Sequence, residues 1–331
     1  MIEKKRALIT GIFGQDGSYL TELLLSKGYE VFGLVRPEDR VNPDFQYAYE
    51  QVKLYEGDVC EYASIARAVR SVVPDEVYNL ASPSSVVTSL EHPAMTSNAT
   101  ALGPVHILEV LRDAKSNAHF FQASSAEIFG DTNISPQSES ALCRPRNPYG
   151  AAKLYAHNMV HVFRKQFDMY AVSGILYNHE SPRRGPGFVT RKITNGVAKI
   201  KNGSEEKLIL GDMGAQRDWG YAPEYVEVMW RMLQQDTPED YVIATGISHS
   251  VEEFVDTAFS YVGLDWREHV KIDDRFKRHP DKVRILGDSR KAKEKLHWEP
   301  NVSFSNLVQI MVEADMRSVR SLQTTVLQPL S

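Results

Sequence analysis

The stretch RALITGIFGQDGSYLTELLLSKG, residues 6–28, decides how this chain begins to fold. Arg6–Thr10 is short and apolar and is followed at once by glycine, as expected for a buried strand. From Asp16 to Lys27 leucines recur on one side of a helix, and Gly28 follows as a stop signal. A strand that turns sharply into a helix through closely spaced glycines is typical of the start of a βαβ unit.

The same alternation of strand and helix patterns continues through the first half of the chain. Strands that alternate with helices pair in parallel through right-handed crossovers. We therefore predict an α/β fold, a doubly wound parallel Rossmann sheet with a smaller, mainly helical C-terminal substrate lobe. The further strands of the predicted sheet are Glu30–Val35, Val52–Tyr55, Glu76–Leu80, His119–Ala123 and Ala171–Leu176.

The pattern loosens after about residue 180, where a loop rich in proline and glycine precedes a predicted helix at Val189–Lys201. Later strands, Leu208–Leu210 and Tyr241–Ala244, are separated by long polar connections. Ser318–Ser331 is weakly patterned, and we expect this tail to be partly disordered.

These patterns predict two interleaved domains without a clean linker. Residues 1–180, with returning segments near 208–246, are expected to form the dinucleotide-binding domain. Residues 181–331 are expected to form mainly the substrate-binding lobe.

The composition of the 331 residues is that of an ordinary globular protein, with 42% hydrophobic and 24% charged residues. A net charge of -5 argues against a nucleic-acid partner, and no apolar run approaches the length of a membrane span. Cys60 and Cys143 are too few for a disulfide framework, and the charged N-terminus lacks the features of a signal peptide. We therefore expect a cytoplasmic protein with no membrane partner, and the sequence suggests no metal site.

Gly11, Gly14 and Gly17 lie between the first strand and the first helix. Glycine there lets backbone N–H groups approach a pyrophosphate at the positive end of the helix, so the turn predicts a dinucleotide site. A tight turn without a ligand is the alternative. The other residues that we expect to line the nucleotide are Gln15, Asp16, Asp58, Val59, Leu80, Ala81 and Ser82.

The second strand ends at Arg36, where an acidic residue would select NAD. An arginine can hold a 2′-phosphate through a charge-assisted contact, which favours NADP as the cofactor. The alternative is a solvated arginine, and Glu38 and Asp39 close by keep that alternative open.

Tyr149 and Lys153 are four residues apart on a helix predicted to begin after Pro148, so they share one face. A phenol with a pKa near 10 becomes a base at neutral pH only if that pKa falls by about three units, which corresponds to roughly 4 kcal/mol. The ammonium group of Lys153 and a cationic nicotinamide ring would both favour the phenolate. The alternative is an ordinary surface pair.

Ser125 and Glu127 follow the strand at His119–Ala123, and ligands bind at the carboxyl ends of such strands. A serine hydroxyl there can bond the oxygen that Tyr149 deprotonates. Simple alcohol oxidation needs no second base, so Glu127 indicates a further proton abstraction beside the new ketone.

With these residues identified, the chain resembles the GDP-mannose 4,6-dehydratases, a family of extended short-chain dehydrogenases/reductases. The resemblance covers about residues 7–300. The segments that carry it are GIFGQDGSYL (11–20), YNLAS (78–82), NPYGAAKLYA (147–156), ILYNHESPRRG (175–185), FVTRKIT (188–194), RDWGYAPEYV (217–226) and PEDYVIATG (238–246).

The resemblance implies a nucleotide-sugar 4,6-dehydratase. Tyr149 takes the proton of the sugar C4 hydroxyl while hydride passes from C4 to NADP. Glu127 then removes the C5 proton, water leaves from C6, and the hydride returns to C6 to give a 4-keto-6-deoxy sugar. The family motifs assign His179 and Arg184 to the cofactor. They assign the GDP-sugar to Ser84, Ser85, Glu127, Asn178, Val189, Lys192, Arg217 and Arg278.

The chain departs from the usual family pattern in several places, among them Ser125, where threonine is usual, and Lys282, where an acidic residue is usual. Ala126 stands where a serine is usual, so a separate proton donor for the leaving hydroxyl is missing. Ser82-Pro83-Ser84-Ser85 replaces Ala-Gln-Ser-His beside the sugar, which leaves a GDP-heptose open as the substrate. Arg36-Pro37-Glu38-Asp39 replaces a segment that supports tetramers, so both a homodimer and a homotetramer remain open. A sugar-nucleotide epimerase or reductase is still compatible with the sequence, and so is an inactive dinucleotide-binding scaffold or redox sensor.

Overall fold

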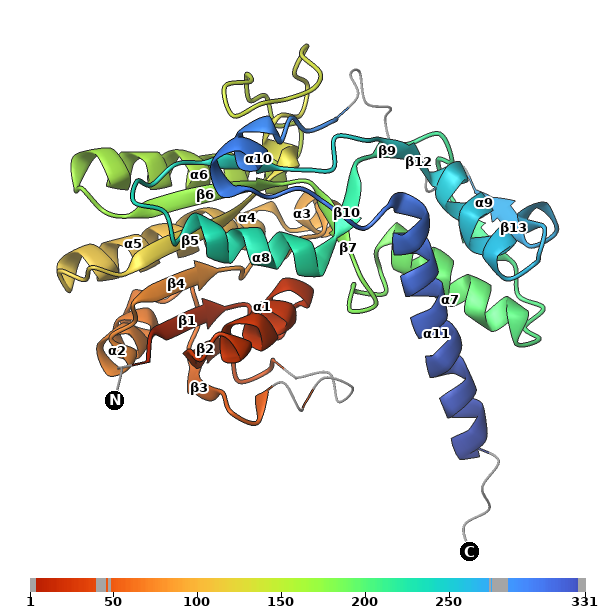
Figure 1. Cartoon of the computed structure of the whole chain (residues 1–331), viewed down its shortest axis with the longest axis horizontal. Coiled ribbons are helices and arrows are strands. Elements are labelled where there is room, and N and C mark those ends of the chain that lie inside the picture. Colours follow the sequence, from red (N-terminus) through yellow and green to blue (C-terminus); the bar gives the residue numbers. More distant parts are fainter. Residues whose placement is uncertain (1–3, 40–45, 47–48, 274, 276–284, 327–331) are drawn as a thin grey trace, which may run out of the picture.

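The computed structural model describes residues 4–39, 46, 49–273, 275 and 285–326. Its centre is a seven-stranded sheet in the order β3-β2-β1-β4-β5-β6-β11 (Figure 1). Every neighbouring pair is parallel, which confirms the predicted doubly wound sheet. The strands are β1 (Arg6–Thr10), β2 (Glu30–Val35), β3 (Lys53–Glu56), β4 (Glu76–Asn79), β5 (His119–Ser125), β6 (Ala171–Leu176) and β11 (Tyr241–Ile243).

Helices cover both faces of this sheet (Figure 1). On β1, Ala7 and Ile9 join one apolar core and Leu8 joins another, because successive side chains of a strand point to opposite faces. Burial on both faces explains why inner strands such as β1 and β6 are nearly continuous apolar runs, whereas the edge strand β3 is largely exposed. One face packs against α1 (Gln15–Ser26), α8 (Ala222–Met232) and α10 (Arg290–Leu296), and the other against α2 (Tyr62–Val72), α5 (Gly103–Asp113) and α6 (Pro148–Gln166).

The chain between β4 and α5 is more irregular than a single crossover helix. It forms α3 (Val86–Glu91), α4 (Pro93–Ser97) and a π-helical turn, η2 (Asn98–Leu102), that continues into α5. All four of these segments contact α6, and Figure 1 shows α3 and α4 beside it.

The smaller lobe is built from short strand pairs and three helices. The pairs are β7 (Asn178–Glu180) with β10 (Trp219–Tyr221), β9 (Gln216–Arg217) with β12 (His249–Ser250), and β8 (Leu208–Leu210) with β13 (Val270–Ile272). The helices are α7 (Val189–Lys201), α9 (Val251–Tyr261) and α11 (Phe304–Val326), which enclose a separate apolar core. A short 3-10 turn, η4 (Trp266–Glu268), precedes β13 in this lobe. Another, η3 (Ala126–Ile128), directly follows β5 of the central sheet.

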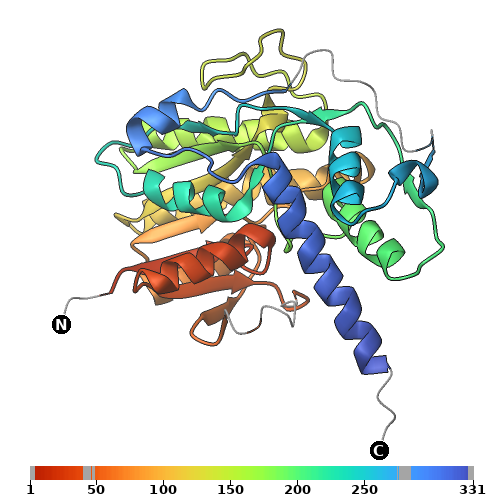
Figure 2. The ribbon, with the colours of Figure 1, turned by 45° about the vertical axis from the view of Figure 1, so that its right-hand side comes forward.

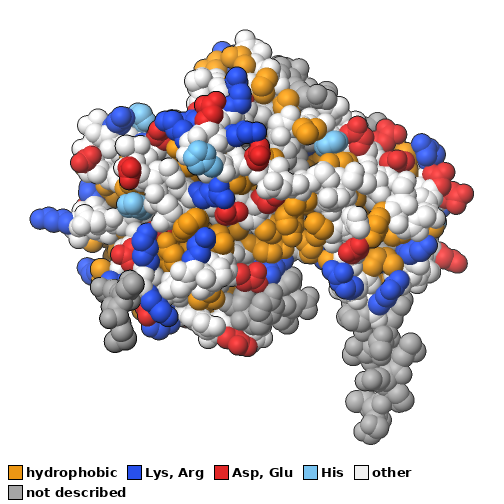
Figure 3. Space-filling view, in the orientation of Figure 1, with side chains coloured by type: hydrophobic (Ala, Val, Ile, Leu, Met, Phe, Trp, Pro, Cys, Tyr) orange, Lys and Arg blue, Asp and Glu red, His pale blue; other side chains and the backbone are white. Residues whose placement is uncertain are grey.

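Hydrophobic side chains gather in the middle of the face seen in Figure 3, where the sheet half meets this lobe. Of the two later strands that we predicted, β11 joins the sheet whereas β8 pairs with β13 in the smaller lobe. The domain boundary near residue 180 stays a prediction.

The expectation of a partly disordered tail from Ser318 is wrong for its first residues, because α11 continues as a helix to Val326. From Phe304 to Gln328 the sequence contains neither proline nor glycine. The helix can therefore continue beyond the part that carries its regularly spaced apolar residues. The helix runs from the junction of the two halves out beyond the body of the protein (Figures 1 and 2).

A buried carboxylate joins α7 to α11. Asp315 is fully buried and accepts hydrogen bonds from Arg191 Nε at 2.9 Å and from Thr194 Oγ1 at 2.6 Å. Arg191 also donates to the carbonyl oxygens of Pro182 and Arg184. The same side chain therefore holds the loop that carries Arg184 against the lobe.

Removal of this arginine is expected to destabilise the protein. Arg191→Met leaves Asp315 buried without its cationic partner, so the free energy of unfolding should fall by about 3–5 kcal/mol. Urea unfolding measures the change. The double variant Arg191→Met/Asp315→Leu should recover a large part of the loss, and a single variant as stable as the wild type would show that the pair contributes nothing.

Candidate active site

The glycine turn between β1 and α1 is too tightly packed for any other residue at two positions. Gly11 has φ 70°, and a Cβ atom there would lie 2.7 Å from the backbone nitrogen of Ala81. A Cβ atom at Gly17 would lie 2.5 Å from the carbonyl oxygen of Gly11. Gly14 is the N-cap of α1, and no side chain caps this helix. The turn therefore fits the pyrophosphate of a dinucleotide, which binds at such a helix start.

Asp16, in the first turn of α1, is paired with His179 of β7. Its Oδ2 atom lies 2.8 Å from Nε2 of His179, and Nδ1 of His179 lies 2.7 Å from the carbonyl oxygen of Tyr177. Both ring nitrogens thus face acceptors, which favours the imidazolium form. Burial works against this charge, but the Asp16 carboxylate outweighs it and raises the pKa of His179. Burial likewise opposes ionisation of Asp16, and His179 still lowers its pKa.

Gln15 fastens the same turn to β7. Its Nε2 atom donates to the carbonyl oxygen of His179 at 3.0 Å, and its Oε1 atom accepts from Ser181 Oγ at 2.8 Å. Because β7 begins at Asn178, the predicted cofactor turn and a predicted substrate segment form one hydrogen-bonded unit.

Tyr149 and Lys153 lie on α6 beside the end of β5, as the spacing predicted, and both are buried. Lys153 Nζ donates to the carbonyl oxygen of Ala123 at 2.7 Å and lies 5.6 Å from the centre of the Tyr149 ring. The backbone contact holds the amine in place between strand and helix.

Burial shifts this pair in the direction opposite to the one that we expected. It raises the pKa of Tyr149 to about 12, although the hydrogen bond with Ser125 and the charge of Arg184 act against the shift. It also lowers the pKa of Lys153 to about 8. In the protein alone, desolvation outweighs the attraction between phenolate and ammonium. The phenolate therefore needs a further positive charge in the site.

Ser125 and Glu127 reach this same site from β5 and η3. The strand extends to Ser125, two residues beyond our prediction, so the serine stands at its carboxyl end. Ser125 Oγ accepts from the backbone nitrogen of Glu127 at 3.2 Å. The Glu127 carboxylate accepts from Asn147 Nδ2 at 2.7 Å, and its charge contributes to the raised pKa of Tyr149.

The residues predicted to line the nucleotide at the other strand ends include three polar side chains that already have partners within the protein. Arg36 is half exposed, and its guanidinium pairs with Asp39 at 2.8 Å and with Glu38 at 3.2 Å. Asp58 Oδ1 accepts from the backbone nitrogen of Cys60 at 2.8 Å. Ser82 Oγ lies 2.8 Å from Thr100 Oγ1. Val59 is buried, and Leu80 and Ala81 lie directly against Gly11.

The predicted substrate residues are spread over several elements. Ser85 caps α3, accepting from Thr88 N at 3.2 Å, and Ser84 before it is exposed. Asn178 starts β7, which lies beside β10, and Arg217 lies in β9, two residues before that strand. Val189 and Lys192 are exposed at the start of α7. Arg184, which was predicted to contact the cofactor, lies in the loop between β7 and α7 and stacks on Phe188, with 3.7 Å between its Cζ atom and the ring centre. Arg278 lies outside the described residues.

Comparison with known proteins identifies the family. The GDP-mannose 4,6 dehydratase family model matches residues 8–311. The chain is 48% identical over 326 residues to GDP-mannose 4,6 dehydratase 1 of Arabidopsis thaliana, covering 95% of this chain and 90% of that protein. It is 43% identical to GDP-mannose 4,6 dehydratase of Homo sapiens, covering 95% and 92%. The chain belongs to the GDP-mannose 4,6-dehydratase family.

Solved structures at lower identity share the fold of this dehydratase family member. A dTDP-glucose 4,6-dehydratase from Bacillus anthracis in complex with NAD superposes with a TM-score of 0.83 at 17% identity, covering 96% of this chain and 98% of that one. The RMD protein of Pseudomonas aeruginosa, complexed with NADPH, gives a TM-score of 0.79 at 20% identity, covering 95% and 100%. Proteins of this fold thus bind either form of the dinucleotide.

Two residues with clear roles in this dehydratase fold were missed by sequence reasoning. Asn147 stands before Pro148, a typical helix start, but its bond to Glu127 could not be inferred from that signal. Asp218 was quoted only as part of a motif. Its buried carboxylate accepts from the backbone nitrogens of Thr245 and Gly246, both at 2.9 Å, and so ties β10 to the loop after β11.

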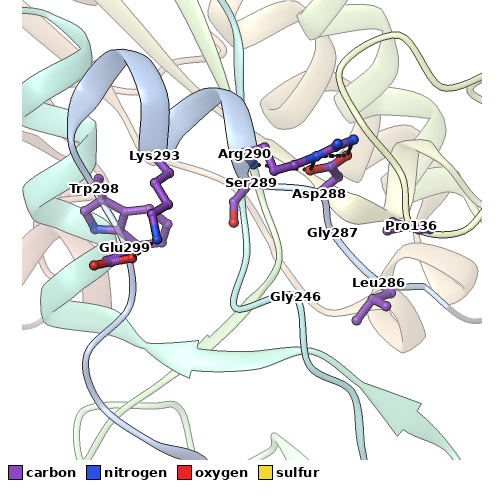
Figure 4. A pocket seen from close by; sticks show the side chains of 10 residues that line it. All are labelled: Pro136, Gly246, Leu286, Gly287, Asp288, Ser289, Arg290, Lys293, Trp298 and Glu299. Atoms are coloured by element: carbon purple, nitrogen blue, oxygen red, sulfur yellow. Dashed lines mark hydrogen bonds and ion pairs between the residues drawn. The ribbon is translucent and has the colours of Figure 1, made fainter.

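Two surface cavities lie away from these catalytic candidates. The larger, of about 330 Å³, lies between α10 and the loop after β11, and its lining includes Gly246, Arg290 and Trp298 (Figure 4). The smaller, of about 240 Å³, is lined by α6 and the segment before β11. None of the predicted site residues lines either cavity.

Neither a metal centre nor a membrane span emerges from the part of the chain that the structure describes. Within it, no cluster of three or more His, Cys, Asp or Glu side chains is arranged to hold a metal ion. None of its helices combines the length and apolarity required to cross a bilayer.

The Asp16–His179 pair should make stability depend on pH. Because the pKa of His179 is raised above its usual 6.5, its contribution is complete below that pH and is lost as the pH rises through the folded-state pKa. Because the pKa of Asp16 is lowered from 3.8, its contribution is present above that value and is lost as the pH falls through the folded-state pKa. Urea unfolding measured from pH 5 to 9 should show that the free energy of unfolding decreases as the pH rises through about neutral and above.

Asp16→Asn is the matched variant for this test. It keeps the size of the side chain and removes the charge, so the alkaline loss of stability should shrink. An unchanged pH profile in Asp16→Asn would show that the pair does not contribute to it.

Proposed function

We propose that this protein is a nucleotide-sugar 4,6-dehydratase that converts GDP-mannose to its 4-keto-6-deoxy product. Family membership supports the reaction class, and the substrate is the one named for the relatives. The observation that carries the proposal is the neighbourhood of Glu127 and Tyr149. A carboxylate beside the Tyr149/Lys153/Ser125 group is what elimination requires and what simple alcohol oxidation does not.

Oxidation at the sugar C4 is assigned to the α6 pair. Tyr149 removes the proton of the C4 hydroxyl, Ser125 hydrogen-bonds the same oxygen, and Lys153 lies close enough to stabilise the phenolate. A bound nicotinamide supplies the acceptor for the C4 hydride and the donor for C6. Its positive charge in the oxidised form also opposes the effect of burial on the Tyr149 pKa.

Elimination is assigned to Glu127. The C4 ketone acidifies C5, and the carboxylate removes that proton. The C6 hydroxyl then needs a proton to depart as water. Ala126, a buried methyl side chain, offers none. Glu127, protonated in the preceding step, is therefore assigned the return of that proton to the leaving hydroxyl. When hydride then adds to C6, C5 regains a proton, which balances the proton that Tyr149 took from the C4 hydroxyl and restores the phenolate.

Substrate binding is assigned to residues from both halves of the chain. Lys192 and Arg217 supply positive charge for the diphosphate, as does Arg278, which lies outside the described residues. Asn178 and Val189 are assigned to the sugar nucleotide from β7 and the start of α7. Ser84 and Ser85 border the sugar.

NADP is the proposed cofactor. Arg36 at the end of β2 supports this choice, because a guanidinium there can pair with a 2′-phosphate. Asp39 and Glu38 hold the guanidinium in the protein alone, so binding of NADP exchanges one set of ion pairs for another. The glycine turn, Gln15, Asp16, Asp58, Val59, Leu80, Ala81, Ser82, His179 and Arg184 are assigned to the same cofactor. His179 acts there through Asp16, since both its nitrogens are engaged.

We assign the protein to the cytoplasm, in keeping with its two free cysteines.

A homodimer is the proposed assembly, formed through the outer side of α3, α4, η2 and α6. Leu90 is 62% exposed on α3. Met95 on α4 and Leu102 at the end of η2 are also exposed, and Tyr155 and Val162, seven residues apart, expose one side of α6. A second copy of the chain presents the same apolar surface and can cover it through a two-fold axis.

Disruption of this surface should produce monomers. Leu90→Asp places a charge in the proposed interface but on an exposed position, so the fold should persist while the dimer dissociates. Sedimentation velocity at micromolar concentration measures the outcome. Ile247→Asp, an equally exposed position outside this surface, is the matched control and should leave the dimer intact. A wild type that sediments as a monomer would contradict the proposal.

The function is tested by incubating the purified protein with GDP-mannose without added cofactor. Mass spectrometry should show the loss of one water from the sugar nucleotide, and denatured protein should release NADP. Glu127→Gln should still oxidise C4 but form product at least 100-fold more slowly, whereas Tyr149→Phe should perform neither step.

Three results would contradict these assignments. A mass shift of zero with a changed sugar configuration would indicate an epimerase, and consumption of NADPH a reductase. Full activity of Glu127→Gln would remove that residue from the mechanism.

A GDP-heptose incubated in parallel tests the second candidate substrate, which the small side chains of Ser84 and Ser85 favour.

A further inference from the structure

Asn147 uses both ends of its carboxamide at the start of α6. Its Oδ1 atom accepts from the backbone nitrogen of Gly150 at 2.8 Å and so caps the helix. Its Nδ2 atom donates to Oε2 of Glu127 at 2.7 Å. One half-buried side chain thus connects the helix that carries Tyr149 to the carboxylate on η3.

The backbone around Glu127 is also held against the start of α6. A Cβ atom at Gly150 would lie 2.4 Å from the carbonyl oxygen of Glu127, so the two segments are in direct contact. The backbone nitrogen of Glu127 donates to Ser125 Oγ. These contacts fix the main chain, but the long side chain of a glutamate keeps its rotational freedom unless its carboxylate is held. The Asn147 amide supplies that hold.

Helix capping alone does not account for an asparagine here. Serine, aspartate and asparagine are about equally good N-caps. Serine would have to cap the helix and donate to Glu127 through one hydroxyl oxygen, and aspartate would set a second carboxylate against Glu127. Of these three residues, only asparagine has separate atoms for the two tasks, Oδ1 for the cap and Nδ2 as the donor to the carboxylate.

We infer that Asn147 is a positioning residue that aims the Glu127 carboxylate for proton abstraction at C5, an inference that rests on the proposed dehydratase function. Tyr149 follows Asn147 by two residues, so the start of α6 sets the positions of both bases. The base for oxidation is carried by the helix itself, and the base for elimination is held by its cap. The start of α6 therefore fixes the position of the base for each of the two steps, which take place on neighbouring sugar carbons.

Three variants separate this role from capping. Asn147→Ser keeps the cap and replaces the separate Nδ2 donor with a single, shorter hydroxyl. Asn147→Asp keeps the cap and places a like charge beside Glu127. Asn147→Ala loses both the cap and the donor.

Single-turnover reactions of the holoenzyme with GDP-mannose give the expected signature. Near-ultraviolet absorbance follows reduced nicotinamide, which reports C4 oxidation, and mass spectrometry follows the loss of water. In Asn147→Ser, oxidation should stay within about threefold of the wild type while water loss slows about 10- to 100-fold, so that reduced nicotinamide accumulates. Asn147→Asp should slow water loss further. Asn147→Ala should match Asn147→Ser in the ratio of the two steps and should also melt at a lower temperature.

Two outcomes would overturn the inference. One is an Asn147→Asp variant, which keeps the cap and has no donor, in which both steps keep their wild-type ratio. The other is a split between the steps that appears only in Asn147→Ala, which would trace the effect to fraying of the helix.

A crystal structure of the Asn147→Ser holoenzyme tests the inference independently of the substrate. A displaced Glu127 carboxylate supports it and an unmoved one overturns it. If the wild type removes no water from GDP-mannose, the proposed function fails, and this structural result still decides whether Asn147 aims Glu127.

Discussion

Parallel pairing of the central strands is the constraint from which the site follows. Because β1, β4, β5 and β6 run in the same direction, their carboxyl ends lie along one edge of the sheet. The glycine turn follows β1, Ser125 ends β5, and β7 follows β6, so groups more than 160 residues apart in the chain meet there. The approach of Gly11 to Ala81 shows how closely these ends pack. A side chain at that position would separate β1 from β4 and displace the turn.

Burial favours the neutral form in both ionisable pairs at this edge, but the net pKa shifts of the two pairs differ. Asp16 and His179 are close, hydrogen-bonded and opposite in charge, so the pKa of each shifts toward its ionised form. Tyr149 and Lys153 are held farther apart, and the pKa of each shifts toward its neutral form. The first pair is a stable connection between cofactor turn and β7. In the second pair, the partner's charge does not outweigh burial, so the proposed reaction relies on the added positive charge of the cofactor to favour the phenolate.

In the proposed mechanism, the departure at Ala126 places the elimination chemistry on a single carboxylate, that of Glu127. A side chain that both takes and returns a proton must stay aimed at two neighbouring carbons during the reaction. The contacts of Glu127 suit that demand, since its backbone nitrogen is bound by Ser125 and its carboxylate by Asn147. The cap of a helix is a suitable support, because its position is coupled to the whole length of α6 rather than to a mobile loop.

The sequence by itself determined the fold class, several strand boundaries and the residue types of the candidate site, because glycine spacing, apolar periodicity and the Tyr149/Lys153 interval are local signals. Only the tertiary structure decided the contacts that join distant segments, such as Asp16 with His179 and Glu127 with Asn147. It also decided the sense in which burial shifts the pKa of Tyr149, and it assigned β8 to the smaller lobe. The physical reason is the same in each case. Desolvation, hydrogen-bond partners and strand pairing depend on which distant residues surround a group, and no local pattern encodes that neighbourhood.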